Sequence, residues 1–507
     1  MAEIELKFEL APKAHAAFRR LPALAGPGRT MHLQATYFDT PDFELRAREM
    51  ALRLRREGRR WAQTLKAGRS GAGGLHAREE WEFARPGATL DTDLLADTPL
   101  AAEPALVRNL GEVFKVDVRR TTWEVEVSPG NRVEVALDRG EVRHGERAEA
   151  VSEVEIESVA GDPFAVFELA DRLVGPQAAA ARAPSALRPS AVTKAQRGYR
   201  LARGEPLAPV RASPAALVPE MSPAQAAQAM AAAALEQLQG NEAGVLAGED
   251  PEYLHQFRVA LRRLRSALGL FRAAGGTLDD ALREELRWIA QLTGPARDWD
   301  VLVTETLPTL LAAYRGGRVA RTVRLRAASR RRDAGTQLRE ALASARYVRL
   351  LLALARWLAG PAPEPQPEPQ ADPESLVDFA LRVVAKRHKR LAADAERLSA
   401  LTPSERHALR LDAKRLRYAL EGLAPLFRRK RVDAHLEALS DIQDDLGRAN
   451  DAAVATRLLA ELDPPAAFAQ FARGWFAALA QASAAGLERH AGRLKSVPRL
   501  KVRKARP

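Results

Sequence analysis

The first 160 residues repeat one pattern, in which charged and apolar side chains alternate along short segments. In residues 3–10, EIELKFEL, the charged side chains Glu3, Glu5 and Lys7 would occupy one face of a β-strand, and the other face is apolar. The same parity recurs in residues 50–56, 61–67, 78–84, 119–127, 132–138 and 151–159. Turn-forming residues separate these segments. The pattern predicts an antiparallel sheet within an α+β domain over residues 1–204.

The number of such strands bears on which way the charged face points. A single alternating strand usually turns its charged face to water and its apolar face to the core. Seven of them crowd carboxylates at spacings where solvated neighbours repel one another. A closed barrel with apolar residues outward, under helices, would line a lumen with the charges, and a barrel of about eight strands can hold one small ligand. Carboxylates suit hard divalent cations, and Arg and Lys suit a phosphorylated anion.

The segment Glu3-Ile4-Glu5-Leu6-Lys7 has the E-x-E-x-K pattern of the CYTH family, the triphosphate tunnel metalloenzymes, and the chain resembles that family in order over nearly all of residues 1–204. The further matching segments are TYFDTPD (36–42), LRLR (52–55), TLK (64–66), GGLHAREEWEF (73–83), VEVALDRGE (133–141), SEVEIE (152–157) and VTKAQRGY (192–199). The resemblance implies an eight-stranded antiparallel β-barrel tunnel with flanking helices, which binds a linear triphosphate together with Mg²⁺ or Mn²⁺.

The resemblance also implies roles for individual residues. The cations expected to bind phosphate oxygens are Lys7, Arg53, Arg55, Lys66, Arg120 and Lys194. The carboxylates expected to hold metal are Glu3, Glu5, Glu153 and Glu155, with Glu80, Glu82, Glu134 and Asp138 as secondary candidates. Glu3, Glu5, Lys7 and Lys66 form the expected catalytic set. The implied reaction is metal-assisted attack of water on a terminal phosphorus, without a covalent nucleophile.

Three activities remain open on such a barrel. The CYTH family includes inorganic triphosphatases, thiamine triphosphatases and a class of adenylate cyclases. The sequence offers no nucleobase pocket that can be argued for, and the attached helical region is typical of the inorganic triphosphatases. The expected function is therefore hydrolysis of tripolyphosphate to diphosphate and phosphate. The alternative to an enzyme is a protein that only binds polyphosphate or associates with polyphosphate granules.

The second part of the chain changes texture. Residues 205–223 form a proline-rich linker, and from about residue 224 long Ala/Leu/Arg/Glu-rich segments predict helices as far as residue 490. The spacer PAPEPQPEPQADP, residues 361–373, would divide this domain into repeats at 224–360 and 374–490. A basic tail, residues 491–507, follows.

Two segments of the helical region match each other. HQFRVALRRLRSAL (255–268) aligns with HALRLDAKRLRYAL (407–420), and LTGPARDWDV (292–301) parallels DDLGRANDAAV (444–454). A tandem duplication of a helical bundle would explain both matches. On a helix each copy aligns a basic stripe within about 80°. The stripe residues are His255, Arg258, Arg262 and Arg265, repeated as His407, Arg410, Lys414 and Arg417.

Charge gathers in this helical part of the chain. Residues 205–507 contain 47 Lys/Arg and 35 Asp/Glu, which supplies nearly all of the net charge of +13. An ordinary solvated basic face would account for one stripe, whereas two matched stripes favour an anion site. These segments resemble the CHAD family over about residues 220–490, and the resemblance implies a groove that binds polyphosphate. Nucleic acid is not the expected partner, because proteins that bind single strands stack bases on aromatic side chains, and aromatic residues are only 6% of this chain.

The expected location is the cytoplasm, where the protein would associate with polyphosphate granules. The chain has no cysteine, which removes disulfides and thiolate chemistry. It has no apolar run of 18 residues, and it enters a strand pattern without a signal-peptide pattern before it.

Overall fold

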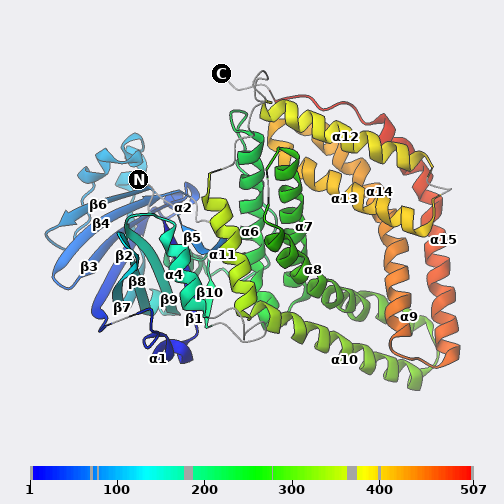
Figure 1. Cartoon of the computed structure of the whole chain (residues 1–507), viewed down its shortest axis with the longest axis horizontal. Helices are drawn as coiled ribbons and strands as arrows, with labels where there is room; N and C mark the ends of the chain where they lie inside the picture. Colours follow the sequence, from blue (N-terminus) through cyan, green and yellow to red (C-terminus); the bar gives the residue numbers. More distant parts are fainter. Residues whose placement is uncertain are drawn as a thin grey trace. The chain divides into compact units, whose positions relative to one another are not determined.

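The protein divides into two compact units. The computed structural model describes residues 4–24, 26–68, 72–76, 79–175, 186–276, 278–361, 374–397 and 401–503. The first unit comprises Met1–Pro209 and Leu342–Gly360, and the second comprises Val210–Ala341 and Pro361–Pro507 (Figure 1). Glu3, all but the first residue of the spacer 361–373 and the last four residues of the basic tail lie outside the described residues.

An antiparallel sheet forms the first unit. Its strand order is β10 (Leu187–Pro189), β1 (Glu5–Leu10), β9 (Arg147–Ala160), β8 (Asn131–His144), β7 (Gly111–Ser128), β2 (Arg29–Asp39), β3 (Met50–Glu57), β4 (Arg60–Ala67) and β6 (Glu79–Arg85). A further two-residue strand, β5 (Leu75–His76), pairs with β1 outside this path. The predicted α+β class is confirmed for this part of the chain.

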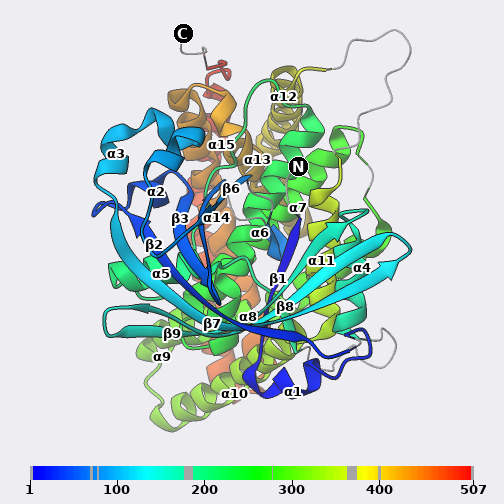
Figure 2. The same cartoon turned by 90° about the vertical axis from the view of Figure 1, so that its left-hand side faces the viewer.

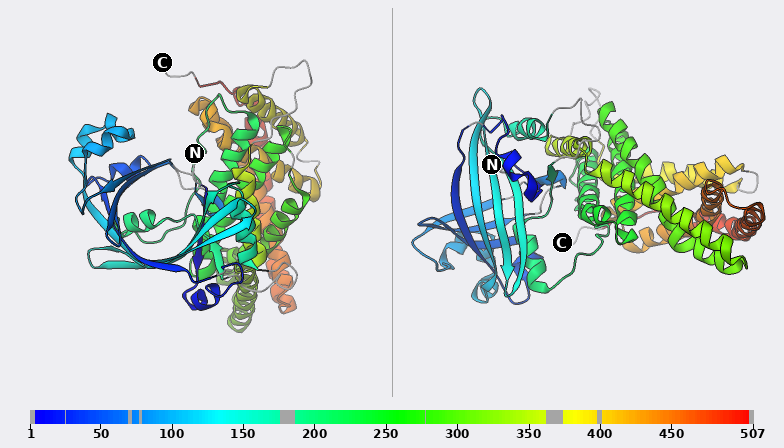
Figure 3. Two further views of the ribbon diagram at one scale, coloured as in Figure 1. Left: turned by 60° about the vertical axis from the view of Figure 1, so that its left-hand side comes forward. Right: turned by 90° about the horizontal axis from the view of Figure 1, so that it is seen from below.

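The sheet curves strongly, but the pairing of its described strands does not form the expected closed barrel of eight. Nine strands follow one open path, and β6 at its end pairs with β4. The second edge of β1 is already taken by the short strands β10 and β5, so it is not available to a long closing strand. Only two residues separate β5, which pairs with β1, from β6, which pairs with β4. Because three Cα–Cα steps reach at most about 11 Å, β1 and β4 lie near each other and the sheet wraps around a concave face (Figure 2; Figure 3, left).

The pairing register places the charged residues of neighbouring strands on one face. Lys7 of β1 lies opposite Glu155 of β9, and Glu153 of β9 lies opposite Asp138 of β8. Asp138 in turn lies opposite Arg120 of β7. Further along the strand order, from β2 to β6, Tyr37 pairs with Arg53, Arg53 with Thr64, and Lys66 with Glu80. Directly opposed residues point to the same face, so these side chains share one surface of the sheet.

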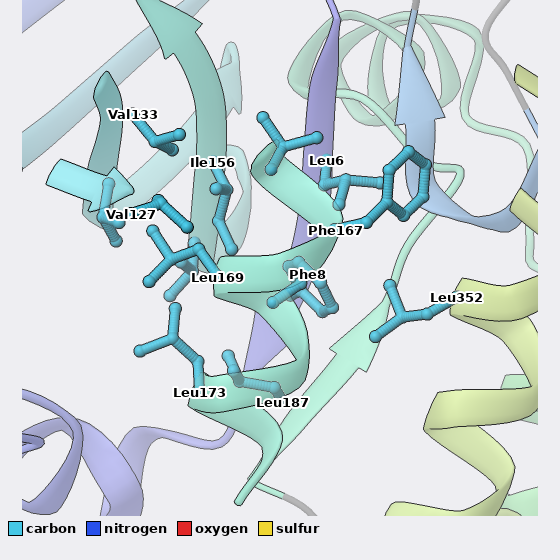
Figure 4. Close-up of a cluster of buried hydrophobic side chains, with 14 of the residues drawn as sticks. Leu6, Phe8, Val127, Val133, Ile156, Phe167, Leu169, Leu173, Leu187 and Leu352 are labelled. Atoms are coloured by element: carbon cyan, nitrogen blue, oxygen red, sulfur yellow. The ribbon is translucent and has the colours of Figure 1, made fainter. Parts of the chain in front are cut away.

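Helices cover the opposite, apolar face, as the alternation predicts. Leu6 and Phe8 are fully buried in a cluster that includes Phe167 and Leu169 of α4 (Ala165–Val174) (Figure 4). The same cluster includes Leu352 of α11 (Ala345–Ala359). A second cluster joins Leu52, Leu54 and Leu65 to the short helices η3 (Asp93–Asp97), η4 (Pro99–Ala102) and α3 (Pro104–Arg108). Helices therefore cover the apolar face of β1, and its charged side chains lie on the opposite face.

One end of the charged face is apolar, which the sequence analysis did not anticipate. Tyr37, Phe114 and Val116 share the face of Arg53 and pack there in one cluster with Tyr199 of α5 (Lys194–Arg203). A Cβ on Gly198 would lie 2.1 Å from the Phe114 ring, so only glycine permits this close approach of α5. The start of α5 then carries Lys194 to the charged residues.

The second unit is all helical, as predicted. Its helices are α6 (Pro223–Ala247), α7 (Pro251–Ala273), α8 (Asp280–Val301), α9 (Leu307–Ala313), α10 (Gly317–Leu342), α12 (Leu376–Glu396), α13 (Pro403–Leu423), α14 (Arg429–Ala460) and α15 (Ala466–Ser496). The two matched segment pairs lie in α7 and α13, and in α8 and α14. Their common origin by duplication stays a prediction. Among the described residues, no helix is both long and apolar enough to cross a membrane.

The expected linker and the expected first repeat both differ from the prediction. Within the expected linker 205–223, Val210 donates its N–H to Asn241 of α6 at 3.0 Å and accepts a hydrogen bond from the Asn241 amide at 2.8 Å. Within the expected repeat 224–360, α11 belongs to the first unit and not to the helical one.

Candidate functional site

Three carboxylates, two of them buried and one partly buried, meet on the charged face of the sheet. Asp138 of β8 and Glu153 and Glu155 of β9 each bring an oxygen within 4.8 Å of the others. Asp138 and Glu153 have no solvent exposure. This carboxylate trio contains two of the four residues expected first as metal ligands, Glu153 and Glu155, and one secondary candidate, Asp138.

Three cations neutralise the carboxylate trio. Lys7 Nζ lies 2.8 Å from Glu153 Oε1 and 3.4 Å from Glu155 Oε1. Lys194 Nζ lies 2.7 Å from Asp138 Oδ2 and 2.8 Å from Glu155 Oε1, and it also pairs with Glu153. Arg120 makes a bidentate contact with Asp138, with N–O distances of 2.8 and 2.7 Å, and also pairs with Glu155. Lys7, Arg120 and Lys194 are thus a cation trio, and all three were predicted to bind phosphate.

The two trios shift each other's pKa values. Burial by itself would raise the pKa of Glu155, but Lys194, Arg120 and Lys7 outweigh it and hold that pKa well below its usual value. Burial would likewise lower the pKa of Lys194, but the carboxylate trio outweighs it and holds that pKa well above its usual value. Glu155 and Lys194 therefore carry opposite charges at neutral pH.

The carboxylate trio has the donor set that a hard divalent cation requires. All its ligand atoms are carboxylate oxygens, which Mg²⁺ and Mn²⁺ prefer. Glu153 lies at ion-pair distance from Lys7, yet neither of its buried oxygens accepts a hydrogen bond of good geometry. A buried carboxylate in that condition has lone pairs left for a metal ion.

The other predicted metal ligands lie outside the trio. Burial and the neighbouring Glu155 raise the pKa of Glu5, which lies opposite Glu157 in the register. Burial raises the pKa of Glu134, which lies between Glu124 and Glu157 on neighbouring strands. Both belong to the charged face, next to the trio and not within it.

A second group of charges lies on β3, β4 and β6. Lys66 Nζ is 2.6 Å from Glu80 Oε2, and Arg53 Nη2 is 3.9 Å from Glu80 Oε1. Arg55 Nη2 is 3.4 Å from Glu82 Oε2. The secondary metal candidates Glu80 and Glu82 thus pair with cations predicted to bind phosphate.

Tyr37 is a site residue that the sequence analysis did not assign. Its side chain is buried, stacks on Phe114 at 4.5 Å and is hydrogen-bonded to Arg53. Burial alone would raise the pKa of Tyr37, but Arg53, and after it Lys194 and Lys66, outweigh it and lower the pKa. Its strand parity relative to Arg53 was the available signal, but it emerges only once the β2–β3 register is known.

The second unit contains a basic cavity of about 1190 Å³. Five of the eight predicted stripe residues line it, namely His255, Arg262, Arg410, Lys414 and Arg417. Arg258 is partly buried and donates to Thr293 Oγ1 at 3.3 Å, while His407 and Arg265 are exposed and do not line the cavity. Sequence reasoning missed further lining arginines, which are Arg211, Arg263, Arg428, Arg429 and Arg503.

Crowded cations dominate the electrostatics of this cavity. Burial, followed by the neighbouring Arg410 and Arg262, lowers the pKa of Lys414 to about 7. Burial and Arg262 lower the pKa of Arg258 to about 10. Arg410 lies 3.9 Å from Asp451 of the second matched segment. An anion in the cavity would relieve this mutual repulsion.

Known proteins resemble the two parts of the chain separately. One curated relative, described as an inorganic triphosphatase of Haemophilus influenzae, is 29% identical over 175 residues. The match covers 34% of this chain and 49% of the relative, so the chain spans about half the length of that protein. A solved structure from Hippeastrum, described as an adenylyl cyclase candidate with a dominant triphosphatase activity, is 19% identical, covers 41% of this chain and 98% of that chain, and has a TM-score of 0.30.

The helical part has its own relatives. A solved CHAD domain from Ricinus communis is 36% identical, and the match covers 58% of this chain and 99% of that chain at a TM-score of 0.49. The CYTH domain family model matches residues 1–199, and the CHAD domain family model matches residues 229–460. The chain therefore has a CYTH domain at residues 1–199, followed by a CHAD domain at residues 229–460.

Proposed function

We propose that the sheet unit hydrolyses inorganic triphosphate to diphosphate and phosphate with a divalent metal ion. The observation that carries the proposal is the pair of trios: three carboxylates, two of them fully buried, face three cations on one surface of the sheet. Fixed cations of this kind bind phosphate oxygens, and carboxylates bind the metal ion that accompanies them. The CYTH match and the triphosphatase relative support the same reaction.

Each group of charged residues has a distinct part in this reaction. The cation trio would bind one part of the triphosphate, and Arg53, Arg55 and Lys66 would bind the rest. Asp138, Glu153 and Glu155 would hold a metal ion, Mg²⁺ or Mn²⁺, and Glu5 is near enough to Glu155 to contribute. Glu3 keeps its predicted role in metal binding and catalysis. When bound, the metal ion screens phosphate charge and lowers the pKa of the attacking water.

The exchange of ion pairs is central to the substrate complex. Lys7, Arg120 and Lys194 bond to carboxylates in the structure, whereas triphosphate offers each of them a more highly charged acceptor. Fixed donors aimed at phosphate oxygens also stabilise the charge that develops on the leaving diphosphate. A Lys or Arg that gains a phosphate partner must leave a carboxylate behind, and that carboxylate is then available to a metal ion.

Phosphate release from tripolyphosphate, ATP and thiamine triphosphate, each with Mg²⁺ or Mn²⁺, tests the proposal. We expect tripolyphosphate to be the best substrate, and Glu153→Gln and Lys7→Ala to lower kcat/KM by more than about 100-fold. Glu112→Gln, at an exposed position of β7, is the matched control and should keep full activity. Turnover that survives Glu153→Gln would refute the metal assignment.

The same assay separates the rival functions. Preference for thiamine triphosphate would indicate a thiamine triphosphatase, and release of cyclic AMP from ATP would indicate an adenylate cyclase. Binding without turnover for every substrate and metal would indicate a non-enzymatic phosphate-binding protein.

For the helical unit we propose binding of polyphosphate in the basic cavity, which would also bring the protein to cytoplasmic polyphosphate granules. The cavity joins lining cations from both matched stripes, with Arg262 from α7 and Arg410 and Lys414 from α13. Arg262→Met with Arg410→Met in the full chain should weaken polyphosphate binding by more than tenfold. Arg318→Met with Arg321→Met on exposed positions of α10 is the control. Unchanged affinity in the first double variant would refute the site.

A further inference from the structure

One helix of the CHAD match belongs to the sheet unit. Residues 229–460 match the CHAD family, yet α11, inside that range, clusters with Met1–Pro209. The chain thus leaves the helical unit at Leu342 and re-enters it at Pro361. A cut between the two family matches would separate α11 from the sheet that it covers.

The contacts of α11 with the sheet unit are close and apolar. Val348, Leu352 and Ala355 of α11 are buried in the cluster that contains Phe8 of β1 and Leu187 of β10 (Figure 4). A Cβ built on Gly73 would lie 2.5 Å from the Ala355 Cβ and 3.3 Å from the Leu351 carbonyl oxygen. The helix is therefore packed directly on the backbone of residues 72–74.

The segments under α11 hold the edge of β1. Ser190 donates its N–H to the Lys7 carbonyl oxygen at 2.8 Å, and Gly74 approaches the same oxygen. β10 pairs with residues 8–10 of β1, and β5 pairs with Glu5 and Leu6. β9 pairs with one edge of β1, and at the other edge β1 is held by these two short segments, which have little stability of their own.

The same segments lead into other charged residues of the proposed site. Four residues after β10, Thr193 caps α5 and Lys194 begins it, with a capping box between Thr193 and Gln196. Three residues after β5, β6 begins, and it carries Glu80, the partner of Lys66. A helix that presses on β10 and on residues 72–74 thus bears on Lys7 and Lys194, and on the strand that carries Glu80.

We propose that α11 is a brace for the triphosphate site, so that the CYTH domain needs this helix of the CHAD region to hold Lys7 and Lys194 in place. The proposal rests on the proposed triphosphatase function for its effect on activity. Ala355 and Leu352 are positioning residues, because they lie on the apolar side of the sheet and act through β1 and β10. The helical region then contributes to the sheet's activity whether or not polyphosphate is bound.

Replacing each of two alanines of α11 by leucine, in the whole chain, tests the brace. Ala355→Leu inserts three carbons between α11 and Gly73, whereas Ala353→Leu makes the same change at an exposed position of the same helix. Leu352→Ala, which removes buried volume, is the second variant, and Leu352→Met should behave as the native protein. Hydrogen exchange of residues 5–10 and 187–190 is measured alongside kcat and KM for tripolyphosphate, at a temperature where near-ultraviolet circular dichroism shows every variant folded.

For Ala355→Leu and Leu352→Ala we expect at least tenfold faster exchange of these two segments and at least a tenfold rise in KM. Exchange in α13 and α14 and binding of polyphosphate should stay unchanged, and Ala353→Leu should match the native protein. Native exchange rates in Ala355→Leu and Leu352→Ala would overturn the brace, and so would faster exchange with native kcat and KM. A native protein that hydrolyses no triphosphate would refute the proposed function, and the exchange comparison alone would then decide whether α11 braces β1.

Discussion

Removing the charge of Lys194 without its bulk probes the two trios most directly. Lys194→Met leaves the carboxylate trio with Lys7 and Arg120 as its remaining partners from the cation trio. The lost contacts include Asp138 Oδ2 at 2.7 Å and Glu155 Oε1 at 2.8 Å. The Lys194 side chain is 11% exposed and that of Asp138 is fully buried, so water cannot replace the missing ammonium.

The expected cost is large because a buried charge loses its partner. Breaking a buried ion pair from one side costs about 3–5 kcal/mol. At pH 7 in the absence of divalent metal, local opening of β8 and β9 should therefore become more frequent by more than about 100-fold, since 1.4 kcal/mol is a factor of ten. Lys115→Met is the matched control, because Lys115 is 64% exposed and, among the residues that the structure describes, forms an ion pair with Glu112. Surface pairs of that kind contribute about 0–1 kcal/mol.

The sign of the pH dependence follows from the shifted pKa values. Because the pKa of Glu155 is lower in the folded protein, its stabilisation is present above its unfolded pKa and is lost as the pH falls through the folded value. The raised pKa of Lys194 makes its stabilisation fully present below the unfolded lysine pKa. In Lys194→Met the carboxylate that has lost its partner can take up a proton. The difference in stability between the variant and the native protein should therefore become smaller from pH 7 to pH 5.

Hydrogen exchange of peptides from β8 and β9, in EDTA and then with Mn²⁺, measures these effects within the sheet unit alone. Mn²⁺ should restore part of the lost protection, because a ligand that binds only the folded state stabilises it. Two results would refute the reasoning about the trios: a loss of stability in β8 and β9 of less than about 1 kcal/mol at pH 7, or a stability difference between variant and native protein that grows on acidification.

Three further predictions concern other parts of the chain. Gly198→Ala places a methyl group 2.1 Å from the Phe114 ring and should destabilise the sheet unit by about 1–3 kcal/mol in calorimetry. Gly111→Ala is the control, because its Cβ meets nothing within 4 Å. Equal melting temperatures of the two variants would contradict the packing of α5 on Phe114. Since the pKa of Lys414 is about 7, its positive charge is lost from pH 6 to pH 8, so polyphosphate affinity should fall over that range in titration calorimetry, and Lys414→Met should flatten the profile. Arg262→Met should reduce the slope of log affinity against log salt by nearly one if Arg262 contacts a phosphate; an unchanged slope would exclude that contact.

Local patterns were sufficient for the main architecture. The parity of EIELKFEL and of the later segments predicts which side chains share a face, because side chains alternate strictly along a strand. The structure confirms that Leu6 and Phe8 are buried under helices and that Lys7, Arg120 and Asp138 share the opposite surface. The helical class of residues 224–490 is equally a local property, because it depends on propensity and on the 3.6-residue period.

Membership of the site depends on register and could not be predicted that way. Alternation does not say which carboxylates of different strands meet, so Asp138 joins Glu153 and Glu155 only through the β8–β9 pairing. The resemblance to a family ranked Asp138 below Glu5, whereas the structure places Asp138 in the trio and Glu5 beside it. Five of the eight stripe residues line one cavity for a similar reason, since the packing of α7 against α13 decides which side of each stripe is covered.

The sequence by itself therefore determined the strand parity, the helical second half and the chemical types of the charged residues, all of which are properties of neighbours along the chain. Only the tertiary structure decided that the strand path stays open, that α5 covers an apolar end of the charged face, and that α11 joins the sheet unit. These three features depend on contacts between residues far apart in the sequence. Leu352 and Phe8 are an example: burial of apolar surface stabilises their cluster, and no pattern of neighbouring residues in the sequence indicates that they meet.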